Sequence, residues 1–187
     1  VTYPDSDGVE FFYDNALRMI SKVDQEGNDT TVDYDSMGQA LTRTKGSQID
    51  NYAYSGLGQI TLAQRGVSGN LDSVAKADRY YDGLGNLTRE YQAVKETSAL
   101  NVDYLYDKGG NVTASYYPGG TLTISRTLTA NNLSNVISRN GTQLADYNYV
   151  GSRAASLIYE TGANDVTATR SYDGVARMTR LAWTQDS

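Results

Sequence analysis

The sequence predicts an all-β protein: a continuous antiparallel meander of β-hairpins that forms a curved or spiral sheet. Three observations lead to this prediction. A short phrase led by tyrosine recurs about every 23 residues, each phrase has the residues of a tight turn, and the flanking residues alternate with the period of a β-strand. A fixed period of this length indicates stacked repeats, none of which can bury its own apolar face. We therefore expect one module over residues 1–187, with about eight repeats.

Seven tyrosines open the phrase: Tyr13, Tyr34, Tyr54, Tyr81, Tyr106, Tyr149 and Tyr172. The clearest copies read YDSMGQAL from Tyr34, YSGLGQIT from Tyr54, YDGLGNLT from Tyr81 and YDKGGNVT from Tyr106. The other three tyrosines begin looser copies. Residues 130–136 (ANNLSNV) fit the same frame without a tyrosine and complete the set of eight.

Each phrase is predicted to be the tip of a hairpin. The aspartate after the tyrosine can accept a hydrogen bond from the backbone two residues further on. The glycine four positions after the tyrosine can adopt a positive φ, which closes a common hairpin turn. The structural positions of the repeat are thus the seven tyrosines and the turn glycines Gly38, Gly58, Gly85 and Gly110.

The strands on both sides of each tip follow from alternation. Larger or apolar residues stand six and often eight positions after the tyrosine, often with threonine between them, as in Ile60-Thr61-Leu62. This alternation predicts a half-buried strand. Turn signals of varied type are expected at the opposite ends of the hairpins, at 26–28, 45–46, 117–120, 140–141 and 162–164. Residues 66–77 and 93–100 are expected as longer excursions, the second with a helical turn. Fifteen or sixteen strands result.

Composition excludes several functional classes. The chain has 187 residues, a net charge of −6 without a basic stripe, and no apolar run that could span a membrane, so neither nucleic-acid binding nor membrane insertion is expected. The absence of cysteine and histidine removes thiolate catalysis and the commonest general base. Sixteen tyrosines against two phenylalanines predict aromatic rings at a sheet surface, where each hydroxyl can find a partner. The start without methionine and the stop in mid-pattern suggest a fragment of a longer chain.

The phrases from Tyr81 and Tyr106 resemble the YD repeat of the RHS (rearrangement hot spot) family, and the resemblance extends over essentially the whole chain. This family includes bacterial polymorphic toxins, the C component of insecticidal toxin complexes, wall-associated proteins and teneurins. The resemblance implies a hollow β-shell wound from a strip of hairpins, which encloses a C-terminal toxin in the bacterial members and serves adhesion in the teneurins. The aspartate-proline segment that carries self-cleavage in RHS toxins has no counterpart here, since the chain has only Pro4 and Pro118.

Candidate chemical sites are few, and no catalytic, cofactor-binding or metal-binding residue is predicted. The recurrence of the aspartates favours turn capping over carboxylate pairs for glycoside hydrolysis. Residues 5–8 resemble the opening of a calcium loop, but Val9 stands where another oxygen ligand is required. The Asn-x-Ser/Thr sequences at Asn28, Asn86, Asn111, Asn132 and Asn140 are attributed to turn chemistry rather than glycosylation. Stacking of a glycan on Tyr52, Tyr54, Tyr104 and Tyr106 remains open as an alternative.

These observations favour a non-catalytic structural module of an exported RHS-type protein, secreted or at the bacterial cell surface. Its partner would be a C-terminal toxin or cargo domain of the same parent protein. The alternative is a cell-surface adhesion module that binds carbohydrate or protein through exposed tyrosine ladders. No cofactor is expected, and unpaired strands at the sheet edges could support homo-oligomers.

Overall fold

The computed structural model describes residues 8–95, 97–160 and 164–185. The chain divides into two compact units, Val1–Asn101 and Val102–Ser187, and each is described by itself. The described residues hold sixteen antiparallel strands and almost no helix, which confirms the predicted all-β class and meander of hairpins. The expectation of a single module of eight repeats stays a prediction.

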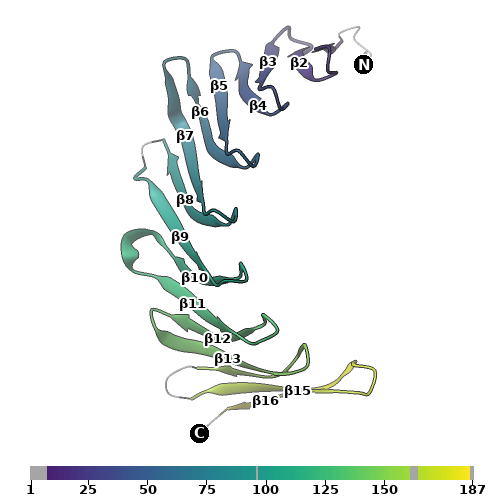
Figure 1. Cartoon of the computed structure of the whole chain (residues 1–187), viewed down its shortest axis with the longest axis vertical. Coiled ribbons are helices and arrows are strands. Elements are labelled where there is room, and N and C mark those ends of the chain that lie inside the picture. The colour runs from purple at the N-terminus through teal and green to yellow at the C-terminus, as the bar shows by residue number, and fades with distance from the viewer. Residues whose placement is uncertain (1–7, 96, 161–163, 186–187) are drawn as a thin grey trace. The chain divides into compact units, whose positions relative to one another are not determined.

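The first unit contains eight strands, each hydrogen-bonded to the next in chain order (Figure 1). Alternation of small or apolar residues with polar ones suits such a ladder, because successive side chains point to opposite faces. The strands are β1 (Glu10–Tyr13), β2 (Met19–Val23), β3 (Asp29–Tyr34), β4 (Ala40–Lys45), β5 (Gln48–Tyr54), β6 (Ile60–Val67), β7 (Asn70–Tyr81) and β8 (Leu87–Val94).

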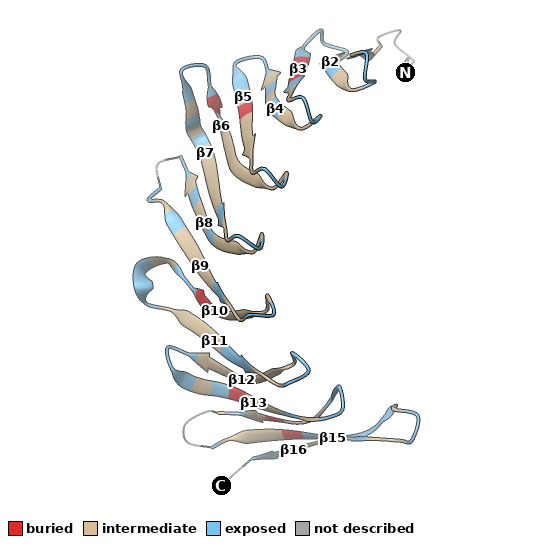
Figure 2. Cartoon of the chain, viewed as in Figure 1, coloured by how far each residue is buried: buried red, intermediate tan, exposed pale blue. Residues whose placement is uncertain are grey.

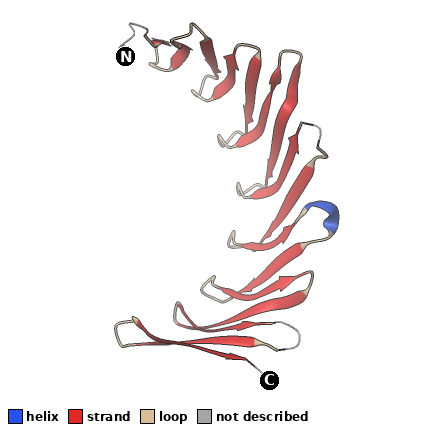
Figure 3. Ribbon diagram, turned by 180° about the vertical axis from the view of Figure 1, so that it is seen from behind, coloured by secondary structure: helices blue, strands red, loops and turns tan. Residues whose placement is uncertain are grey.

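The second unit repeats this arrangement, with β9 beginning at the boundary between the units. A short 3₁₀ helix, η1 (Pro118–Gly120), joins β10 to β11 and is the one helical element among the described residues (Figure 3). The strands are β9 (Leu100–Tyr106), β10 (Val112–Tyr116), β11 (Thr123–Leu128), β12 (Ser134–Arg139), β13 (Thr142–Val150), β14 (Arg153–Tyr159), β15 (Val166–Tyr172) and β16 (Met178–Gln185).

The predicted excursion at residues 66–77 is wrong. Strands β6 and β7 continue through it and pair as far as Val67 and Asn70, so that only Ser68 and Gly69 form the turn. The φ of +82° at Gly69 permits this tight connection. The hairpin of β6 and β7 is thus longer than its neighbours, and exposed and partly buried residues alternate over residues 70–75 of β7. The helical turn expected at 93–100 is not seen in its described residues, and Gly162 and Ala163 of another expected turn lie outside them.

Very little of either unit is buried (Figure 2). In the first unit, Thr30, Val32 and Asp50 are buried, with 9%, 8% and 3% of their surface exposed. In the second unit, Ala145, Leu157 and Ala168 form a small cluster against which Ile137 and Tyr147 pack. Among the described residues of each unit, the strands form a single layer, so lateral contacts between neighbouring strands carry the stability.

Candidate functional site

The turn after each tyrosine is closed by one recurring set of hydrogen bonds. In the repeat of Tyr81, the backbone N of Asp82 donates to the carbonyl O of Asn86 at 3.0 Å, and the N of Gly85 donates to the O of Asp82 at 3.0 Å. The carboxylate Oδ1 of Asp82 accepts from the backbone N of Leu84 at 2.9 Å and of Asn86 at 2.8 Å. The same pattern is seen after Tyr13, Tyr34, Tyr106 and Tyr172, and with a hydroxyl in place of the carboxylate at Ser55 and Thr129.

Positive φ recurs at one position of this turn. The four glycines singled out from the sequence, Gly38, Gly58, Gly85 and Gly110, have φ of +83°, +76°, +83° and +79°. In the looser copies the same position is held by Leu17, Asn132 and Ala176, all with positive φ. Side chains with a Cβ are strained there, so these looser turns depend on the surrounding hydrogen bonds.

One turn at the opposite ends of the hairpins, predicted at residues 26–28 only as a turn of varied type, is of the same type as the tyrosine-led turns. Asp24 accepts from the backbone N of Glu26 at 3.2 Å and of Asn28 at 2.8 Å, and Gly27 has φ of +79°. The signal was present in the printed sequence, because Val23-Asp24 to Asn28 differs from the phrase only in lacking the tyrosine. Conversely, the copy at Tyr149 has a two-residue turn at Gly151 and Ser152, since Val150 pairs with Arg153.

The tyrosine hydroxyls join successive repeats. Tyr81 Oη donates to the carbonyl O of Ile60 at 3.0 Å, and Ile60 is the cross-strand partner of Tyr54, the tyrosine of the preceding repeat. Four further bonds have the same form: Tyr34 to Met19 O at 2.9 Å, Tyr54 to Ala40 O at 2.8 Å, Tyr149 to Ser134 O at 2.7 Å and Tyr172 to Ala154 O at 2.9 Å. Burial raises the pKa of the Tyr54 and Tyr149 phenols, which keeps these donors protonated. We call these five bonds the tyrosine staples.

A β-bulge accompanies the tyrosine in each hairpin. Tyr81 pairs with Leu87 whereas Tyr80 pairs with Arg89, so Thr88 is an extra residue in the outgoing strand. Its hydroxyl donates to the carbonyl O of Tyr80 at 3.1 Å, and the matching Thr113 donates to Leu105 O at 3.3 Å. The prediction that these threonines lie in strands is confirmed, and the bulge is a local irregularity within those strands. A bulge shifts the register by one residue and re-aims the side chains that follow it.

The last residue of the turn adds a second kind of link between repeats. The side-chain amide of Gln59 donates to Gly85 O at 2.8 Å, and Arg18 Nη1 donates to Asp35 O at 3.1 Å. In other copies this residue turns back to its own aspartate, as Asn86 does to Asp82 at 2.9 Å. The amides of Asn28 and Asn111 also donate to the aspartate of their own turn, which supports turn chemistry at these Asn-x-Thr sequences.

Hydrogen bonds to the turn aspartates stabilise their ionised form. The pKa is held below the usual range chiefly by the backbone N–H of Arg18 at Asp14, of Asn28 at Asp24, of Asn111 at Asp107 and of Arg177 at Asp173. At Asp82 the side-chain amide of Asn86 is the largest cause of the lowered pKa. These carboxylates are therefore acceptors within turns, a role that leaves no proton for acid catalysis near neutral pH.

The tyrosines considered for glycan stacking lie in different settings. Tyr54 Oη is engaged in a staple, and Tyr52 lies two residues earlier on the same face of β5. Tyr104 and Tyr106 occupy the corresponding positions of β9 in the second unit. The structure thus brings Tyr52 and Tyr54 together in one unit and Tyr104 and Tyr106 together in the other.

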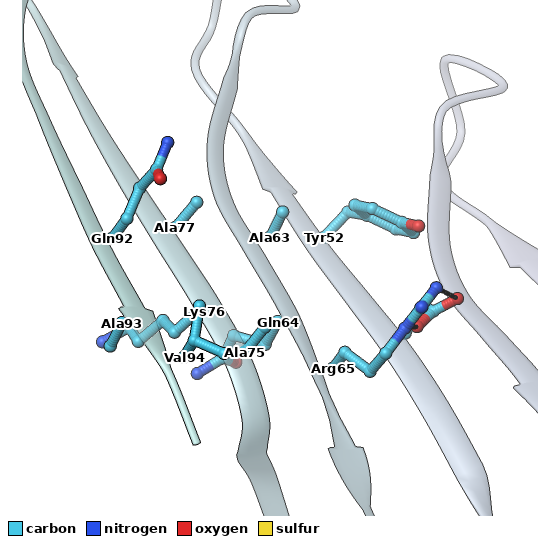
Figure 4. A pocket seen from close by; sticks show the side chains of 11 residues that line it. Tyr52, Ala63, Gln64, Arg65, Ala75, Lys76, Ala77, Gln92, Ala93 and Val94 are labelled. Atoms are coloured by element: carbon cyan, nitrogen blue, oxygen red, sulfur yellow. Dashed lines mark hydrogen bonds and ion pairs between the residues drawn. The ribbon is translucent and has the colours of Figure 1, made fainter. Parts of the chain in front are cut away.

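Tyr52 forms one wall of a groove on β5–β8 with a volume of about 310 Å³ (Figure 4). The floor is made of alanines in register: Ala63 lies opposite Ala77, and Ala75 lies opposite Arg65. Small residues on neighbouring strands leave this space between larger neighbours.

Polar groups flank the groove on both sides. The Arg65 guanidinium donates from Nε and Nη2 to the two carboxylate oxygens of Asp50 at 2.6 and 3.1 Å, beside Tyr52. Gln92 and Val94 form the other side. An aromatic wall beside a guanidinium and an amide has the chemistry to bind a sugar ring, by stacking and by hydrogen bonds. This groove could not be predicted from the sequence, because it depends on which residues lie opposite one another on neighbouring strands.

Two further findings concern ions and membranes. Within the described ranges, no group of three or more acidic side chains is placed to hold a metal ion. Residues 5–7 of the calcium-like sequence lie outside those ranges. No helix in the described part of the chain is long and apolar enough to cross a membrane.

Comparisons with known proteins give matches among solved structures alone, at low identity and low TM-score. No family model matches the chain, and no curated protein matches it. Similar solved structures include a Photorhabdus luminescens Tc holotoxin pore with a TccC3 variant, at 11% identity and a TM-score of 0.34, which covers 97% of this chain. The crystal structure of a TcdB2–TccC3 complex matches at 11% identity and a TM-score of 0.33, with 94% of this chain covered. The chain spans about 15% of the length of either structure's matched chain.

Proposed function

We propose that the chain is a non-catalytic wall module of a larger exported protein of the RHS type. In this proposal its YD-repeat hairpins form part of a β-shell that encloses a toxin or cargo domain of the same parent protein. The parent would be secreted or exposed at the bacterial cell surface. The observation that carries the proposal is that the polar groups of the repeat form structural hydrogen bonds. The turn aspartates accept from the backbone of their own hairpins, and the tyrosine hydroxyls donate to the preceding hairpin.

This arrangement suits a wall for a physical reason. Lateral pairing satisfies the strand backbone, and the staples and turn links add side-chain bonds between consecutive hairpins to those of the ladder itself. Each added repeat contributes the same contacts, so the strip can be lengthened without a new core. A wall of this kind can hold proteases and solvent away from an enclosed segment.

The experiment that tests enclosure is limited proteolysis of the complete parent protein. We expect the domain encoded downstream of this chain to resist trypsin in the intact protein. Combined Tyr34→Phe, Tyr54→Phe and Tyr81→Phe substitutions should accelerate its digestion, whereas Tyr80→Phe should not. Equal digestion rates in all three proteins would contradict the wall proposal, and so would hydrolase turnover by the chain itself.

The groove beside Tyr52 favours a second candidate function, carbohydrate binding at a cell surface. A glycan array probed with the chain would test it. Binding that is lost in Tyr52→Ala and retained in Tyr80→Ala, an exposed tyrosine of the same unit outside the groove, would support recognition. An array without signal would leave the wall proposal as the better account.

Self-association through sheet edges stays a prediction. Among the described residues, β1 pairs only with β2 and β16 only with β15. The β16 edge exposes Met178, Leu181 and Trp183, by 55%, 45% and 55%. An unpaired strand with apolar side chains can add a strand from a second copy.

A further inference from the structure

A group of cations surrounds a cavity of about 310 Å³ on β2–β4, away from the groove at Tyr52. Lys22 of β2 lies opposite Thr30 of β3, and Thr30 lies opposite Lys45 of β4. Arg43 lies opposite Val32 in the next row of the same face. Three cationic side chains from two strands therefore converge over a floor of buried Thr30 and Val32.

The carboxylate that lines this cavity is engaged elsewhere. Asp24 Oδ1 accepts the Asn28 backbone N at 2.8 Å, and its Oδ2 accepts the Asn28 amide at 3.1 Å. Lys45 Nζ lies 3.7 Å from the same Oδ2, which is a loose ion pair. The lowered pKa of Asp24, caused first by the Asn28 backbone N–H, means that it contributes one negative charge against three positive ones.

A second carboxylate stands beside Arg43 but is also occupied. Asp50 is the cross-strand partner of Arg43 on β5. Its two carboxylate oxygens accept from Arg65 at 2.6 and 3.1 Å. Arg65 belongs to β6, which pairs with β5 on the side opposite to β4 and Arg43. Arg43 therefore makes no ion pair or side-chain hydrogen bond with any residue that the structure describes.

Lys22 is likewise free of a carboxylate in the described part of the chain. Its ammonium lies 5.8 Å from the centre of the Phe11 ring, which is a weak cation–π contact. A local excess of positive charge is unusual in a chain whose net charge is −6. The aliphatic stems of Lys22, Arg43 and Lys45 can cover the buried floor residues, which would explain why long side chains stand at these positions. Such covering does not require a positive charge at all three of them.

We propose that this cavity binds a phosphate or sulfate group, carried by a small molecule as a monoester. The planar guanidinium of Arg43 can donate two parallel hydrogen bonds to such an oxyanion, and the ammonium groups of Lys22 and Lys45 supply charge from the flanking row. The cavity volume lies at the lower end of the range for small-molecule sites, and it exceeds the volume of the oxyanion alone. The remaining space would accept the alcohol or sugar part of the ester.

Isothermal titration calorimetry of the chain tests the proposal with four probes: inorganic phosphate, inorganic sulfate, glucose 6-phosphate and glucose 6-sulfate. We expect saturable binding of at least one ester that weakens as sodium chloride is raised. Arg43→Gln should weaken it at least tenfold and Lys45→Gln severalfold. Arg43→Lys, which keeps the charge and loses the fork, should fall between wild type and Arg43→Gln. Lys108→Gln, at an exposed turn of the other unit, is the matched control and should bind as wild type does.

The outcomes separate the sources of the oxyanion and can overturn the proposal. Tighter binding of an ester than of its inorganic anion supports the ester, whereas equal binding of the two overturns that part and leaves a site for the free anion. Absence of saturable binding for all four probes overturns the whole proposal. Equal affinity for acetate or for an acidic peptide would show a general cation patch and would also overturn it. Far-UV circular dichroism checks folding; if Arg43→Gln is unfolded, Lys45→Gln, whose side chain is 52% exposed, gives the decisive comparison.

Discussion

Removal of a tyrosine staple should weaken the first unit by a measurable amount. In Tyr81→Phe the ring remains and only the hydroxyl that donates to Ile60 O at 3.0 Å is lost. A net intramolecular hydrogen bond contributes about 1 kcal/mol, so the free energy of unfolding should fall by that amount. Tyr34, Tyr54 and Tyr81 belong to successive repeats, and their three replacements should together cost about 3 kcal/mol if they act independently. That loss is large for a domain whose total stability is about 5 to 15 kcal/mol.

The assay is urea unfolding followed by far-UV circular dichroism, with linear extrapolation to water. Tyr80→Phe is the matched control, because Tyr80 is the adjacent residue on the other face of β7 and is 54% exposed. Its replacement should change the unfolding free energy by less than about 0.5 kcal/mol. If Tyr81→Phe and Tyr80→Phe had equal effects, the staples would have no energetic role and the repeat-to-repeat argument would fail.

Three further predictions concern the turns and the groove. Gly85→Ala should lower the unfolding free energy by about 1 to 2 kcal/mol, because φ is +83° there and a residue with a Cβ is strained in that conformation. The control Gly83→Ala, at a glycine without positive φ, should change it by less than about 0.5 kcal/mol in the same urea assay. The lowered pKa values of Asp82 and Asp107 give stability that is present above the unfolded value of 3.8 and is lost as the pH falls below it. Melting temperatures recorded from pH 6 to pH 2 should therefore drop in wild type and drop less in the double variant Asp82→Asn/Asp107→Asn. A parallel drop in both proteins would refute the role of these carboxylates. Arg65→Met should lower the melting temperature, because it leaves the buried Asp50 carboxylate without the guanidinium that it accepts from. Adding Asp50→Ala to the same chain should recover part of the loss; no recovery would mean that the aliphatic stem of Arg65, and not the ion pair, stabilises the unit.

The fold was accessible from the sequence because its signals are local. A turn such as Asp82 to Asn86 depends on residues within four positions of one another, and its recurrence fixes the hairpin class before any contact is known. The same locality extends to the turn at residues 24–28: a turn is predicted there, and its type could have been predicted from Asp24, Gly27 and Asn28.

The features that escaped prediction depend on register between strands. The extra residue at Thr88 is visible only when Tyr81 is paired with Leu87 and Tyr80 with Arg89. The acceptor of a tyrosine hydroxyl lies 14 to 21 residues away at Tyr54 and Tyr81, a spacing that varies with the length of the intervening hairpins. The groove and the cationic cavity likewise require that Ala63 face Ala77 and that Thr30 lie between Lys22 and Lys45.

The direction of the tyrosine staples has a consequence for synthesis on the ribosome. Every acceptor carbonyl precedes its tyrosine in the chain, as Ile60 precedes Tyr81 and Ala154 precedes Tyr172. A nascent hairpin can therefore form its tyrosine hydrogen bond to the hairpin synthesised before it, without any later segment. Assembly from the N-terminus in this order would leave one unpaired strand edge exposed at a time. This limits the opportunity for mispairing between distant hairpins with similar turns.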